Sequence, residues 1–85
     1  MAAPQSMWHV NDVVAYDVMR ELSISVQARL VERLRGGDDA ARTELLGVRH
    51  DTLQLDGYDR VRVDSYTQQL QQRDDDLARA DHGAS

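Results

Sequence analysis

The chain has 85 residues, a formal net charge of −5 and no cysteine, and each of these properties excludes a class of protein. A chain of this length forms one small domain, and without cysteine it has neither disulfides nor thiolate metal ligands, so oligomerisation is the expected source of added stability. Nucleic-acid binding needs a dense basic face. Ten arginines against fifteen acidic residues argue against one, so no nucleic-acid partner is expected.

The sequence also lacks the features of a membrane-spanning or exported protein. No run of residues approaches the roughly 20 apolar residues of a membrane span, and residues 1–6 lack the basic region and apolar core of a signal peptide. We therefore expect a cytoplasmic protein. Residues 1–10 are expected to form a flexible leader, residues 11–72 a single helical domain, and residues 73–85 a flexible acidic tail.

Helical periodicity is strongest between Asn11 or Asp12, which are good N-cap residues, and the glycine pair at 36–37. The glycines predict the left-handed end of an amphipathic helix. Ser23 and Ser25 interrupt the segment among β-branched residues, so we expect one long helix or two shorter ones, the second capped by Ser25. Apolar residues recur at every fourth position, at Val14, Val18, Leu22, Val26, Leu30 and Leu34.

A second, shorter helix is expected after the glycine pair. It begins at Asp38 or Asp39 and fades near residues 47–50. The two helices should fold back on each other as a helical hairpin. The apolar stripe from Val14 to Leu34 is either the core of this hairpin or wide enough to need a second subunit in a four-helix arrangement, and the small size of the chain favours the second subunit.

The segment at 52–63 has two interpretations. Apolar and polar residues alternate on both sides of Asp56-Gly57, which is typical of a β-hairpin. A two-residue turn would, however, place the leucines and valines of the two strands on opposite faces. We favour a helix from Asp59 onward, with the seam of a short coiled coil at Val63, Tyr66, Leu70 and Leu77. The expected fold is therefore all-α: a helical hairpin and a C-terminal helix with a coiled-coil seam, assembled as a helix-bundle dimer.

Residues 55–70 resemble the DivIVA-like domain of bacterial polar-growth and division scaffolds. The family pattern is Gly-Tyr-Asp, then Val-Asp, an aromatic residue two positions later and a leucine seam. It is matched by Gly57, Tyr58, Asp59, Val63, Asp64, Tyr66 and Leu70. The resemblance implies a sharp turn at the glycine, a helix capped by Asp59 and a parallel coiled coil. The family usually has a basic residue where this chain has Asp56, so the resemblance favours helical self-association over membrane association.

No group of residues has the pattern of a catalytic or metal site. His50 precedes Asp51, as in an acid–base pair, but no nucleophile accompanies them. His9, His50 and Asp51 lack the spacing of zinc ligands, and residues 74–76 are typical of a solvated acidic run. We therefore expect no enzymatic activity, no metal and no cofactor.

The expected function is protein binding by a small adaptor or scaffold that acts as a homodimer and also binds another, unidentified protein. The alternative is a regulatory inhibitor, such as an antitoxin or anti-activator, that neutralises a basic partner while residues from Gln71 onward fold on the target. In either case aromatic and apolar side chains should form the interface. The expected interface residues are Trp8, Val14, Val18, Leu22, Val26, Leu30, Leu34, Tyr58, Val63, Tyr66 and Leu70.

Overall fold

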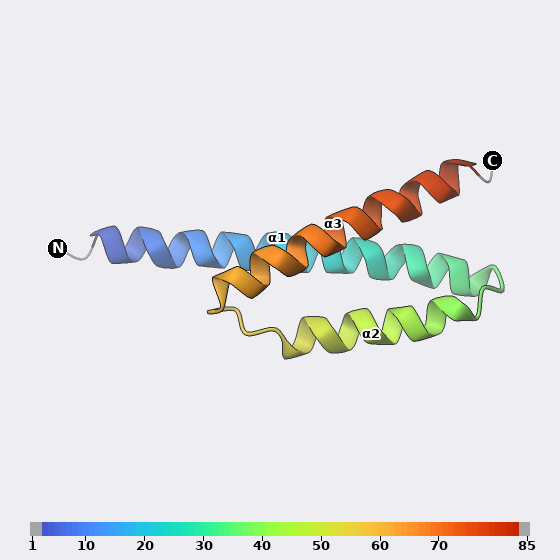
Figure 1. Cartoon of the computed structure of the whole chain (residues 1–85), viewed down its shortest axis with the longest axis horizontal. Coiled ribbons are helices and arrows are strands. Elements are labelled where there is room, and N and C mark those ends of the chain that lie inside the picture. Colours follow the sequence, from blue (N-terminus) through green and yellow to red (C-terminus); the bar gives the residue numbers. More distant parts are fainter. Residues whose placement is uncertain (1–2, 84–85) are drawn as a thin grey trace.

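The computed structural model describes residues 3–83 of the chain, and the side chains of residues 11–80. This part of the chain forms three helices and contains no strand: α1 (Ala3–Arg35), α2 (Ala40–Gln54) and α3 (Arg60–Gly83). Helix α2 returns antiparallel to α1, and α3 then crosses α1 (Figure 1). The all-α fold, with a hairpin and a C-terminal helix, is confirmed. The β-hairpin alternative for residues 52–63 is wrong.

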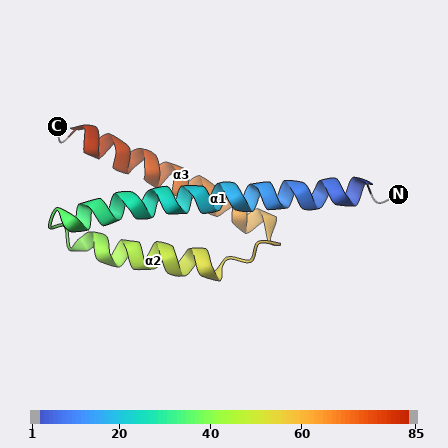
Figure 2. The same cartoon turned by 180° about the vertical axis from the view of Figure 1, so that it is seen from behind.

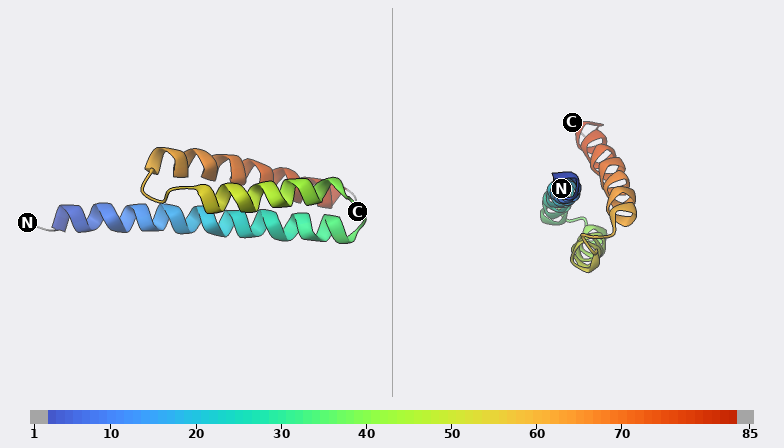
Figure 3. Two further views of the ribbon diagram at one scale, coloured as in Figure 1. Left: turned by 90° about the horizontal axis from the view of Figure 1, so that it is seen from below. Right: turned by 90° about the vertical axis from the view of Figure 1, so that its left-hand side faces the viewer.

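Helix α3 runs parallel to α1, on a different side of it from α2. Arg60 at the start of α3 donates to Asp12 of α1 at 3.1 Å, and Arg29 of α1 donates to Asp74 of α3 at 3.0 Å. The partners are 48 and 45 residues apart, and such similar offsets occur only when two helices run in the same direction. The view along the long axis shows α2 and α3 at different positions around α1 (Figure 3).

The turn between α1 and α2 depends on Gly37, which has a φ of 100°. The amide of Gly37 donates to the Leu34 carbonyl at 3.1 Å, and the amide of Asp38 donates to the Arg33 carbonyl at 3.0 Å. These two bonds define a Schellman motif, in which a residue without Cβ adopts the left-handed conformation at low cost. The predicted helix end at the glycine pair is confirmed.

The turn between α2 and α3 is built by two aspartates. The Asp56 side chain accepts from the Tyr58 amide at 2.9 Å, and the Asp56 carbonyl accepts from the Asp59 amide at 3.0 Å. The Asp59 side chain accepts from the Arg62 amide at 3.2 Å, which is the bond of an N-cap residue. A helix therefore begins at Arg60, where the β-hairpin would have placed a second strand.

Both long helices extend beyond the expected bounds. Helix α1 begins at Ala3, within the expected flexible leader; Pro4 suits the first turn, where its missing N–H is not needed. Asp12 lies inside the helix and pairs with Arg60, so it does not cap it. Helix α3 continues to Gly83, through most of the expected flexible tail, and Leu77 in that segment is fully buried.

Helix α1 is also continuous through the two serines, because both hydroxyl groups make bonds to other helices. Ser23 bonds to Thr52 of α2 at 2.8 Å, and Ser25 donates to Asp74 of α3 at 2.7 Å. These tertiary bonds offset the low helix propensity of the segment.

The core lies mainly between α1 and α3. The three buried residues of α3 are spaced seven apart, which is the repeat of a coiled-coil seam. The predicted seam is therefore present, and α1 of the same chain covers it. The buried apolar residues are Met19, Val26, Leu30, Ala41, Val63, Leu70 and Leu77.

The molecule is long and thin, with extents of 56 × 24 × 16 Å. Its radius of gyration is 15.4 Å, whereas a compact domain of this length has about 12 Å. Its accessible surface is 6248 Å², whereas a compact 9.6 kDa monomer exposes about 5,100 Å². The elongated shape thus exposes roughly 1,100 Å² more surface than a compact chain of the same mass.

Candidate protein-binding surface

A hydrogen-bonded network joins the three helices at their centre. The Thr52 hydroxyl donates to the Val48 carbonyl at 2.8 Å, so the buried Ser23 hydroxyl serves as the donor to Thr52. Gln27 donates to the Ser23 oxygen at 2.9 Å. From α3, the Tyr66 hydroxyl lies 3.3 Å from both the Thr52 hydroxyl and the Val48 carbonyl. The network fixes the axial positions of the three helices relative to one another, which in turn places their outer surfaces.

Replacing Thr52 by valine is expected to lower the free energy of unfolding by about 1 kcal/mol, because the buried Ser23 hydroxyl loses its acceptor. Chemical denaturation monitored by circular dichroism measures this change. Thr67→Val is the matched control, since the Thr67 hydroxyl donates only to the Val63 carbonyl of its own helix. The control should change stability by less than about 0.5 kcal/mol. Equal effects of the two substitutions would contradict a role for Thr52 between helices.

The expected interface residues separate into three groups. Four are buried inside the chain, so within the monomer they belong to the core. Leu22, Leu34 and Tyr66 are partly buried against that core. Val14 and Tyr58 are exposed, as is Val18. The side chain of Trp8 lies outside the described residues. The four buried residues are Val26, Leu30, Val63 and Leu70.

A different set of apolar side chains is exposed on the side of α1 and α2 that faces away from α3. Figure 2 shows these two helices side by side, with α3 behind α1. Tyr16 and Ile24 of α1 and Leu53 of α2 line a groove of 240 Å³ between the two helices, with Arg20 and Arg49 also in its lining. Ile24 is 60% exposed and Leu53 is 81% exposed.

This groove adjoins a second hollow, because Tyr16 lines both. The second hollow has a volume of 300 Å³ and includes Val13, Gly57 and the exposed Tyr58. A Cβ atom at position 57 would lie 3.3 Å from Cδ2 of Tyr16, so glycine allows the turn to pack closely on this ring. Together with Leu46 of α2, these apolar residues define the outer face: Val13, Tyr16, Ile24, Leu46, Leu53 and Tyr58.

Apart from Tyr58, the residues of the outer face were not predicted from the sequence, although α2 carries a signal for them. Arg42, Leu46, Arg49 and Leu53 follow one another at spacings of four, three and four residues, which places them on one side of a helix. All four are exposed. The second helix predicted from the sequence fades near residues 47–50, so that prediction does not place Leu53 on a helix, whereas α2 continues to Gln54.

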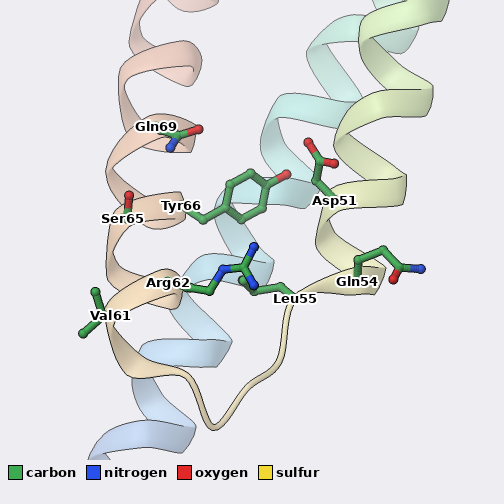
Figure 4. Close-up of a pocket in the computed structure, with 8 residues that line it drawn as sticks. All are labelled: Asp51, Gln54, Leu55, Val61, Arg62, Ser65, Tyr66 and Gln69. Atoms are coloured by element: carbon green, nitrogen blue, oxygen red, sulfur yellow. The ribbon is translucent and has the colours of Figure 1, made fainter.

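A further groove, of 470 Å³, lies between α2 and α3 and is more polar. Figure 4 shows Tyr66 reaching from α3 toward α2, with its hydroxyl on the side of Asp51, while Val61 points away from the other labelled side chains. Burial raises the pKa of the Tyr66 hydroxyl, its bond to Thr52 opposes this effect, and the Asp51 charge adds to it. Tyr66 therefore remains a neutral hydrogen-bonding group at physiological pH.

The three consecutive acidic residues at 74–76 of α3 have partners within the protein. Asp74 accepts from Ser25 and Arg29, Asp75 from Gln71 at 3.1 Å, and Asp76 from Gln72 and Arg79. The expected solvated run at residues 74–76 is thus partly engaged in ion pairs and hydrogen bonds. Residues 71–83, which the inhibitor hypothesis expects to fold on a target, are already helical.

Nothing among the described residues forms a group of three or more potential metal ligands. His50 is exposed, and its Nδ1 atom lies 3.6 Å from Oδ1 of Asp51. None of the helices over residues 3–83 is long and apolar enough to cross a membrane.

No protein-family model, curated protein or solved structure matches the chain. The resemblance of residues 55–70 to the DivIVA-like domain stays a prediction.

Proposed function

We propose that the chain is a non-enzymatic protein-interaction module that acts as a homo-oligomer. The observation that supports this most directly is the accessible surface of 6248 Å² on a chain of 9.6 kDa. This surface follows from the elongated shape of the molecule, and it is large enough to include the ~800 Å² that each partner buries in a standard protein interface.

The exposed side chains support the same function. Large apolar residues are exposed on all three helices, and several lie next to one another in the two adjoining hollows around Tyr16. Contiguous exposed apolar surface is typical of a site that binds another protein. An adaptor of this kind acts by contact alone, and its partners recognise shape, apolar area and charge.

Sedimentation equilibrium of the full chain tests self-association. We expect a mass close to twice 9.6 kDa at micromolar concentrations, falling toward 9.6 kDa on dilution. Circular dichroism at the same concentrations reports whether helix content falls with dissociation. A mass of 9.6 kDa throughout the micromolar range would contradict the proposal.

A further inference from the structure

We infer that the outer face of α1 and α2 is the surface on which a second copy of this chain docks, with α1 of each copy packed against α2 of the other. This inference rests on the proposed function, and it replaces the interface that the sequence predicted. Four of those predicted residues are buried inside the monomer, so they are not available to a partner without unfolding.

The first support is the apolar content of the outer face. Ile24 is 60% exposed, Leu46 57%, Leu53 81% and Tyr58 85%. In the monomer these apolar side chains are in contact with water, so burying them in an interface would lower the free energy. The two hollows that share Tyr16 join Ile24, Leu53 and Tyr58 into one surface, and Leu46 lies two helical turns before Leu53 on the same side of α2. The exposed Val61 of α3 does not line either hollow.

The second support is the helical spacing on α2. Leu46 and Leu53 are seven residues apart. Arg42 precedes them and Arg49 lies between them, on the same side of the helix. This is the spacing that accepts a second helix along its length. The helix that fits must itself present apolar side chains along one side, as α1 does with Val13 and Ile24.

The third support is charge. Around its exposed apolar residues α1 carries the exposed acids Asp17 and Glu21 and the exposed Arg20, a net charge of −1, whereas α2 carries the exposed Arg42 and Arg49, a net charge of +2. A contact between α1 and the α2 of a second copy therefore brings surfaces of opposite net charge together, whereas α2 against α2 would bring arginines together. In a dimer with a two-fold axis, α1 of each copy contacts α2 of the other, so the same contact is formed twice.

The area is consistent with this occupant. Five of the six apolar side chains of the outer face are more than half exposed, and each partner in a standard interface buries ~800 Å². Because α1 and α2 in each copy are already antiparallel, the two pairs together would form a four-helix layer with α3 on each outer side.

Leu53→Glu and Ile24→Glu in the full chain test the inference, with Val61→Glu as the matched control. Val61 is 79% exposed but lies outside the outer face, so all three substitutions add the same charge at exposed positions. Sedimentation equilibrium should show dissociation constants for Leu53→Glu and Ile24→Glu raised at least about tenfold, because an unpaired carboxylate is costly to bury. Val61→Glu should dimerise like the unmodified chain. Circular dichroism checks that the helices remain.

The possible outcomes distinguish the inference from the proposed function. If the unmodified chain dimerises and Leu53→Glu and Ile24→Glu dimerise equally well, the outer face is not the interface, while self-association stands. If Val61→Glu dissociates as fully as the other two variants, the interface is not confined to the outer face and the inference is also overturned. If the unmodified chain is a monomer throughout, both the inference and the proposed function are contradicted.

Discussion

Replacing Leu77 by alanine is expected to lower the free energy of unfolding by about 2–5 kcal/mol. The Leu77 side chain is fully buried although it lies in the segment 73–85 that the sequence predicted to be a flexible tail. Its removal leaves a cavity between α1 and α3 and takes away part of a small core, and such changes are among the most costly single substitutions. Urea denaturation followed by circular dichroism measures the effect.

Leu53→Ala is the control for Leu77→Ala, because the same atoms are removed from a side chain that is 81% exposed. At a concentration where the chain is monomeric, the control should cost less than about 0.5 kcal/mol. If Leu77→Ala costs no more than the control, residues 73–83 do not pack on α1 in solution. The flexible tail predicted from the sequence would then be the better description.

Replacing Asp74 by asparagine is expected to lower the free energy of unfolding by about 1–3 kcal/mol at neutral pH, since hydrogen bonds to a charged group are stronger than neutral ones. Asp74 accepts from Ser25 at 2.7 Å and from Arg29 at 3.0 Å, and both partners belong to α1. Asp75→Asn is the control, because Asp75 is exposed and accepts only from Gln71 of its own helix. Equal losses in the two variants would contradict this role for Asp74.

The same carboxylate makes stability depend on pH. The Ser25 bond lowers the pKa of Asp74 below its ordinary value, burial opposes this, and Arg29 lowers it further. Above the unfolded pKa of about 3.9 the contribution of Asp74 is fully present. As the pH falls, the unfolded chain binds the proton first, so stability decreases until the folded pKa is passed. The free energy of unfolding of Asp74→Asn should therefore fall less steeply at acidic pH than that of the unmodified chain.

The elements of this fold were readable from local patterns. The glycine pair, the N-cap at Asp59 and the spacing of Val63, Leu70 and Leu77 each predict a feature that the structure contains. These signals concern a turn, a helix start and one face of a helix, and each depends on residues close in sequence.

The sequence does not show in the same way which helix packs against each apolar face. A seam with a seven-residue spacing is the same whether a second chain or a distant helix of the same chain packs against it. Here α1 covers the α3 seam, so residues expected at an interface lie in the core. Likewise, Asp74 looks like part of a solvated acidic run because nothing near it in sequence indicates Arg29, 45 residues earlier.

The parallel arrangement of α1 and α3 also favours folding of the hairpin of α1 and α2 before α3 packs on it. Helix α2 folds back on α1 through the four-residue turn at 36–39, so this hairpin closes a short loop. The bonds between α1 and α3 join residues 45–49 positions apart and need a much longer closure. During synthesis, α1 and α2 are complete before α3 exists. Met19, Val26 and Leu30 of α1 are not fully buried until Leu70 and Leu77 have been synthesised. An incomplete chain is therefore most prone to aggregate before α3 is complete.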